Sequence, residues 1–157
     1  MSEQMRDAIR AGAAHNTPLA DVYKASTGGV SKLDFYRMVL SMIETGEIPN
    51  LLVCCCGHDC ARCKVFRATV AQYDWERETL LQDAVAFYQT TFGQQLSMVE
   101  LHCLSGNSDE MMAGCLACPF MACCKEKGLR ACRECHEYPC RMLAGYEAQY
   151  VNKVNQV

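Results

Sequence analysis

The chain has 157 residues, enough for one ordinary domain or for a helical segment followed by a small metal-dependent domain. Half of its residues are apolar, which excludes a disordered tail, and its formal charge of −3 argues against a nucleic-acid partner. The apolar share includes 13 cysteines, so the conventional hydrophobic core is smaller than that share indicates.

Residues 1–50 are predicted to form an N-terminal helical segment. Good helix formers fill residues 3–14, and a short second helix is expected to follow. The clearest helix comes next, with Ser31 placed to cap its start and Gly46 and Pro49 after its end. Its apolar positions form a broad face that must pack against its own chain or a second copy, so a homodimer through these helices is one expectation.

Residues 51–157 are predicted to form a cysteine-rich metal-binding domain. A helix is expected from Ala61 to about Ala71, and a longer amphipathic one from Asp74 to Phe92. Trp75, the lone tryptophan, is interpreted as an anchor in the core or in an interface.

Short helices are expected in the last third of the chain as well. Ser108 resembles a helix start, Pro119 suits the first position of a helix that Gly128 ends, and Pro139 does the same for a C-terminal helix. The pattern of residues 96–104 does not distinguish strand from helix. The predicted fold is therefore mostly α, with short helices cross-braced by cysteine metal sites and little β structure.

The cysteines fall into spaced clusters. Seven of the 26 residues from Cys115 to Cys140 are cysteine, and the spacing C-x2-C-x4-C occurs twice among them. A C-x2-C pair places two thiolates on one tight turn, which suits two corners of a tetrahedron around zinc. The pairs Cys115/Cys118 and Cys132/Cys135 lie 17 residues apart, which is typical of a structural zinc site with four cysteine ligands.

A second centre is expected from cysteines outside this repeat, namely Cys56, Cys60, Cys63 and Cys103. About two zinc ions are therefore predicted, with ten cysteines as candidate ligands. These are Cys56, Cys60, Cys63, Cys103, Cys115, Cys118, Cys123, Cys132, Cys135 and Cys140.

Three cysteines are left over, Cys54, Cys55 and Cys124. Each is next to another cysteine, and neighbouring side chains diverge, so these three are interpreted as buried thiols that bind no metal. Cys118 and Cys140, by contrast, are expected at helix N-termini, where the helix dipole and the unpaired N–H groups favour a thiolate.

Two alternatives to structural zinc stay open. Four cysteines also serve a [4Fe–4S] cluster, and Cys118-Pro119 is similar to the Cys-Pro that closes ferredoxin cluster motifs, so an iron–sulfur redox protein is the alternative. A metal-dependent enzyme would need an open coordination position, and so many thiols favour closed sites. No catalytic triad, phosphate-binding loop or paired-carboxylate site stands out.

The N-terminus and the cysteine usage predict a cytoplasmic protein. The first residues mix acidic and basic side chains without the apolar stretch of a signal peptide. The longest apolar run, residues 51–56, is too short to span a bilayer, so no membrane partner is expected. In a reducing compartment, clustered C-x2-C pairs are metal ligands more often than disulfides.

The order of the cysteine motifs resembles an uncharacterised cysteine-rich family, domain of unknown function 3795. The resemblance rests on Cys56-Gly57-x2-Cys60-x2-Cys63, the isolated Cys103, the C-x2-C-x4-C motif, and the C-x2-C motif followed by Glu-Tyr-Pro-Cys, and spans roughly residues 56–146. It implies metal binding and no assigned reaction. Members often carry a second cysteine just after the isolated one, where this chain has Ser105-Gly106.

That departure makes His58 and His102 candidates to complete the first site. Together, these observations predict a small, mostly helical, zinc-binding protein that acts as a binding or adaptor module for a protein partner.

Overall fold

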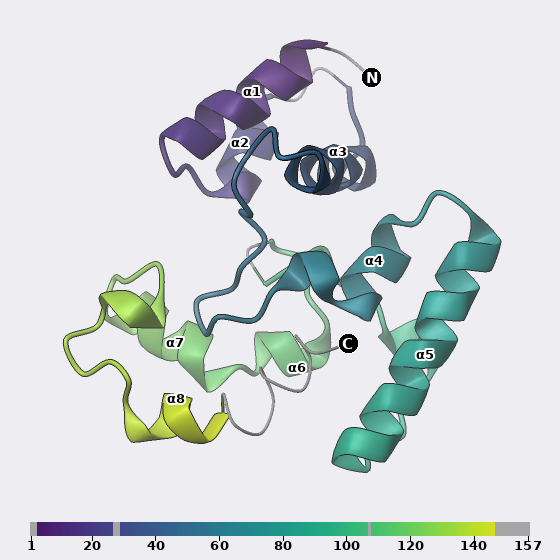
Figure 1. Ribbon diagram of the computed structural model, residues 1–157, viewed down its shortest axis with the longest axis vertical. Coiled ribbons are helices and arrows are strands. Elements are labelled where there is room, and N and C mark those ends of the chain that lie inside the picture. Colours follow the sequence, from purple (N-terminus) through teal and green to yellow (C-terminus); the bar gives the residue numbers. More distant parts are fainter. Residues whose placement is uncertain (1–2, 27–28, 107, 147–157) are drawn as a thin grey trace.

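The computed structural model describes residues 3–26, 29–106 and 108–146, and it is mostly helical, as predicted (Figure 1). Within these ranges the β pairing amounts to a single antiparallel bridge between Val53 and Asp59. The α-helices are α1 (Glu3–Ala14), α2 (Leu19–Ala25), α3 (Lys32–Glu44), α4 (Lys64–Val70), α5 (Asp74–Phe92), α6 (Ala113–Leu116), α7 (Pro119–Glu126) and α8 (Arg141–Tyr146). Short 3-10 turns are η1 (Cys60–Arg62), η2 (Met98–Glu100) and η3 (Cys132–Glu134).

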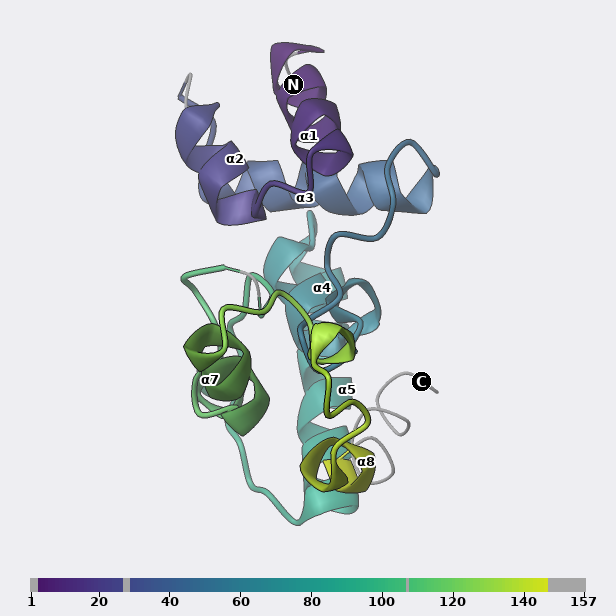
Figure 2. The same cartoon turned by 90° about the vertical axis from the view of Figure 1, so that its left-hand side faces the viewer.

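Helices α1 to α3 gather at one end of the molecule, with α1 and α2 lying across α3 (Figure 2). Ser31 caps α3 as predicted, because its hydroxyl oxygen accepts a hydrogen bond from the backbone N–H of Asp34 at 3.1 Å. The apolar face of α3 is buried within this chain. Its members are Phe35, Tyr36, Met38, Val39, Leu40 and Met42.

The contact between α1 and α2 depends on a glycine. A Cβ atom at Gly12 would collide with the side chain of Val22 on α2. We expect Gly12→Val to lower the free energy of unfolding by about 1–3 kcal/mol through overpacking. Denaturant unfolding measures this loss, and Gly145→Ala in α8 is the control, because among the described residues no atom beyond its chain neighbours and its own helix backbone lies within 4 Å of the added Cβ. Equal stability of the two variants would contradict the close packing.

Helices α4 and α5 form the second apolar layer together with the loop that follows α5. Val65, Tyr88, Leu101 and Cys103 are among its buried members. Trp75, at the start of α5, does not join this core: it is 69% exposed and stacks on Tyr73, with ring centroids 6.2 Å apart. Trp75 is therefore not an anchor of the core, and its role as an interface anchor stays a prediction.

In the loop after α5, the predicted helix start at Ser108 is replaced by a turn. Ser108 does not start a helix, because its hydroxyl donates to the carbonyls of Ser105 and Glu110 and closes a turn. The next helix, α6, begins at Ala113. The ambiguous segment 96–104 contains the turn η2 and no strand.

The predicted ends of α7 are confirmed, since Pro119 is its first residue and Gly128, with φ +66°, follows it. Helix α8 begins at Arg141, two residues later than Pro139 suggested, and residues 147–157 lie outside the described part. None of the described helices combines the length and the hydropathy needed to cross a membrane.

Candidate metal centre

All thirteen cysteines are free thiols, and most of them belong to the main apolar core rather than to surface loops. Those of this core come from the loop between α3 and α4 and from the C-terminal third of the chain, two parts of the chain that lie side by side in Figure 1. The cysteines that form or contact this core are Cys54, Cys55, Cys56, Cys60, Cys63, Cys118, Cys132 and Cys140.

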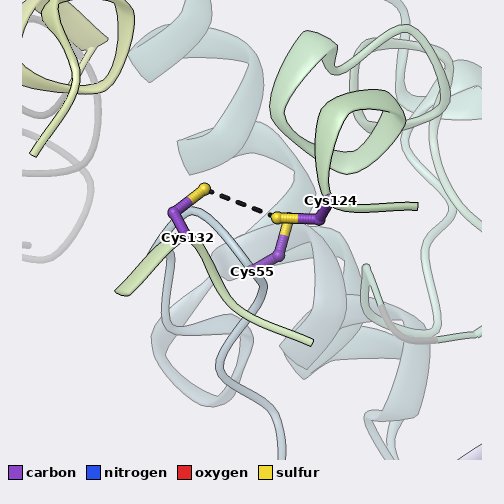
Figure 3. Close-up of side chains that lie close together, drawn as sticks. All are labelled: Cys55, Cys124 and Cys132. Atoms are coloured by element: carbon purple, nitrogen blue, oxygen red, sulfur yellow. Dashed lines mark hydrogen bonds between the residues drawn. The ribbon is translucent and has the colours of Figure 1, made fainter. Parts of the chain in front are cut away.

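Cys55, Cys124 and Cys132 form a compact group, the three-thiol centre. Their sulfur atoms point toward one another (Figure 3), and all lie within 4.8 Å of each other. The Cys124 and Cys132 sulfurs are 3.6 Å apart. Four sulfurs around one zinc ion are about 3.8 Å apart, as tetrahedral geometry with Zn–S bonds of about 2.3 Å requires. The centre therefore has the spacing of a single-ion thiolate site.

Each thiol of this centre comes from a different segment. Cys55 lies in the loop before η1, Cys124 in α7, and Cys132 at the start of η3. The backbone N–H of Leu129 donates to the Cys124 carbonyl (2.8 Å), which turns the chain back after α7. The N–H of Cys132 then donates to the Cys55 carbonyl (2.9 Å). These backbone bonds bring the two loops into register.

The surroundings of Cys132 show which thiols could complete the centre. Burial, the hydrogen bond with Cys124 and the negative charges of nearby cysteines raise the pKa of Cys132 to about 12. Those cysteines are Cys124, Cys56 and Cys140. Several thiols cannot all ionise at such close range unless a cation is present, so the three-thiol centre could hold a divalent metal, and Cys56 and Cys140 are its neighbouring thiols.

The other buried cysteines form close pairs. The sulfurs of Cys54 and Cys60 are 3.2 Å apart, and their shared proton lowers the pKa of Cys54 while it raises the pKa of Cys60. The thiol of Cys115 donates to the sulfur of Cys103 and lowers the pKa of Cys103 to about 7.

The structure distributes the two predicted C-x2-C pairs over different groups. Cys115 lies beside Cys103, and the thiol of Cys118 contacts that of Cys56. Cys132 joins the three-thiol centre, whereas the sulfur of Cys135 is 3.6 Å from the Lys127 ammonium nitrogen. These four cysteines do not converge on one point, because within the described ranges three or more metal-donor atoms come within 4.8 Å of one another only at the three-thiol centre.

Two members of the three-thiol centre, Cys55 and Cys124, are residues that the sequence interpretation set aside as thiols that bind no metal. Adjacent side chains do diverge, as expected, but here they diverge toward different sulfur groups. Cys54 turns to Cys60, Cys55 to the three-thiol centre, and Cys56 to Cys118. A run of adjacent cysteines therefore indicates that its thiols serve different sulfur groups.

The histidines lie outside the three-thiol centre. His58 is buried, and the loss of solvent lowers its pKa, so it is neutral at pH 7. His102 is exposed, and its Nε2 atom is 3.3 Å from a Glu110 carboxylate oxygen. His58 instead lines a cavity of about 360 Å³, into which four cysteines face. They are Cys54, Cys56, Cys115 and Cys118.

The comparisons with known proteins give a family and no function. No curated protein and no solved structure matches the chain. Residues 52–145 match the family described as "Protein of unknown function (DUF3795)", and this range contains every cysteine of the chain. The chain therefore belongs to the DUF3795 family.

Proposed function

We propose that the chain is a zinc-binding protein in which the three-thiol centre joins the loop before η1 to the C-terminal third. The observation that carries this proposal is the convergence of Cys55, Cys124 and Cys132 within 4.8 Å from three separate segments. The spacing supports a single ion over a [4Fe–4S] cluster, because a cluster places iron and sulfide between its cysteine sulfurs and keeps them farther apart.

The proposed role of the metal is structural. The donors at the centre are all thiols, and further thiols adjoin it, so coordination by four sulfurs leaves no open position for a substrate. We therefore propose a cytoplasmic binding module for a protein partner rather than an enzyme. Free thiols throughout the chain agree with a reducing compartment, and the exposed stacked pair Tyr73 and Trp75 supports a protein contact.

Elemental analysis of protein purified without oxygen tests the metal. We expect a colourless sample that contains zinc in stoichiometric amounts and no acid-labile sulfide. A brown sample with iron and acid-labile sulfide would instead establish the iron–sulfur alternative and overturn the zinc proposal.

A further inference from the structure

The loop between α3 and α4 contains a short hairpin that carries two cysteines on the same face. An antiparallel bridge pairs Val53 with Asp59. The residues that follow them, Cys54 and Cys60, each donate a backbone N–H to a carbonyl of the facing segment, at 2.8 Å and 3.0 Å respectively. Because successive side chains of an extended segment point to opposite faces, those of Cys54 and Cys60 share one face of the hairpin. Their sulfurs are 3.2 Å apart.

The Cys54 and Cys60 sulfurs need to move little to form a disulfide. An S–S bond is about 2.05 Å long, so the two sulfurs have to approach by only about 1 Å. Both side chains are buried, and both are free thiols. The backbone hydrogen bonds of the hairpin do not involve the sulfurs, so oxidation leaves them in place. Cys55, which lies between the two in sequence, turns toward the three-thiol centre, so the pair shares no sulfur with that centre.

The sulfur of Cys54 is accessible through the cavity of about 360 Å³. Cys54 lines this cavity, whereas Cys60 does not. The exposed residues Gln94 and Glu100 also line it, and it has room for several molecules of the size of water. Gly106, another lining residue, lies so close to the Cys54 sulfur that a Cβ atom there would collide with it. A small oxidant in the cavity therefore meets Cys54 first.

We propose that Cys54 and Cys60 form a redox-active dithiol that hydrogen peroxide oxidises to a disulfide. The sulfur of Cys54 attacks one peroxide oxygen and the O–O bond breaks, which leaves a sulfenic acid on Cys54 and releases water that carries the Cys54 thiol proton. The sulfur of Cys60 then attacks the sulfenic sulfur, the S–O bond breaks, and the S–S bond forms. A second water leaves with the thiol proton of Cys60. Two thiols and one hydrogen peroxide thus give one disulfide and two waters.

This chemistry suits the compartment proposed for the chain. In the cytosol disulfides are rare, and those that form are mostly transient and redox-sensing. Thiol–disulfide exchange with small cellular thiols returns such a pair to the reduced form. The dithiol therefore adds a peroxide-responsive site to the proposed zinc-binding protein, and its oxidation removes no member of the three-thiol centre.

Differential thiol labelling of the unsubstituted, zinc-loaded chain tests the pair directly. After one equivalent of hydrogen peroxide, free thiols are blocked with iodoacetamide in denaturant, the disulfide is reduced, and the released thiols are labelled with N-ethylmaleimide. Trypsin leaves residues 38–62 as one peptide, in which tandem mass spectrometry locates each label. We expect N-ethylmaleimide on Cys54 and Cys60 alone, and a mass loss of about 2 Da in the intact oxidised chain.

Zinc content of the same samples separates this proposal from the proposed function. It is expected to be equal before and after oxidation, because the pair contributes no sulfur to the three-thiol centre. Absence of zinc would count against the three-thiol centre only, since the labels still report on the dithiol. N-ethylmaleimide on a different pair or on no cysteine would overturn the dithiol. So would oxidation of Cys54 and Cys60 that occurs only after zinc is chelated, because the two thiols would then be metal ligands.

Two serine variants test which thiol meets the peroxide. In Cys60→Ser the sulfenic acid on Cys54 has lost its partner, so dimedone is expected to label Cys54. In Cys54→Ser no disulfide and no dimedone label on Cys60 are expected, because Cys60 does not line the cavity. Cys118→Ser is the matched control, since Cys118 lines the same cavity and this variant should form the disulfide as the parent chain does. Dimedone on Cys60 in place of Cys54 would refute Cys54 as the attacking thiol, and loss of the disulfide in Cys118→Ser would refute the pairing.

Discussion

Removing the metal with a strong chelator is expected to unfold the chain from Cys103 to Cys140 and to leave α1 to α3 folded. A structural zinc ion contributes about 10–16 kcal/mol of apparent binding free energy, as much as the whole net stability of an ordinary domain. Helices α6, α7 and α8 have four, eight and six residues, too few to be stable in isolation.

Circular dichroism and hydrogen exchange measure this effect. The helical signal should fall on chelation and return when zinc is added. Amide exchange should accelerate in α7 and in the turn η3, while the buried face of α3 keeps its protection. A spectrum that stays unchanged after the metal has demonstrably left would contradict the stabilising role of the centre.

Cys124→Ser is expected to destabilise the protein far more than Cys123→Ser, although the two positions are adjacent on α7. The sulfur of Cys124 is buried and lies 3.6 Å from that of Cys132, whereas Cys123 is outside the three-thiol centre. Loss of a metal ligand is expected to lower the free energy of unfolding by more than about 4 kcal/mol, whereas a substitution away from such a site changes it by no more than about 0.5 kcal/mol.

For a domain of this length, a loss of that size lowers the melting temperature by about 8–16 °C. Thermal unfolding of the two variants side by side measures the difference. If Cys123→Ser proved as destabilising as Cys124→Ser, the contribution would come from the general packing of α7 and not from the three-thiol centre.

The elements that the sequence predicted correctly depend on local chemistry. The hydroxyl of Ser31 caps α3, and Pro119 begins α7 directly after Cys118, because both signals act within a few residues. Cys118 and Cys140 do precede helices, and the Cys140 sulfur accepts from the N–H of Leu143 at 3.5 Å. Such features can be predicted before any tertiary contact is known.

The grouping of the sulfurs could not be predicted in the same way. A C-x2-C spacing specifies one turn, but which turns meet depends on loop closure and on close backbone approaches far apart in the sequence. The hydrogen bond from the Cys132 N–H to the Cys55 carbonyl joins a predicted C-x2-C motif to a cysteine outside every predicted motif, and no spacing rule predicts it.

Gly106 illustrates the same limit. In the sequence, the absence of a second cysteine after Cys103 suggested that His58 or His102 completes the first site. In the structure, the sulfur of Cys54 lies against Gly106, in the space that a side chain at position 106 would fill. Cys54, which the sequence interpretation set aside because of its neighbouring cysteines, therefore has the sulfur nearest to position 106. This contact is visible only in the folded structure.

Zinc K-edge X-ray absorption of the protein purified without oxygen tests the central claim most directly, because it reports the atoms bound to the metal. The account predicts a single shell of about four sulfur ligands at about 2.3 Å, with no iron in the sample. A shell dominated by nitrogen or oxygen, or iron in place of zinc, would contradict it.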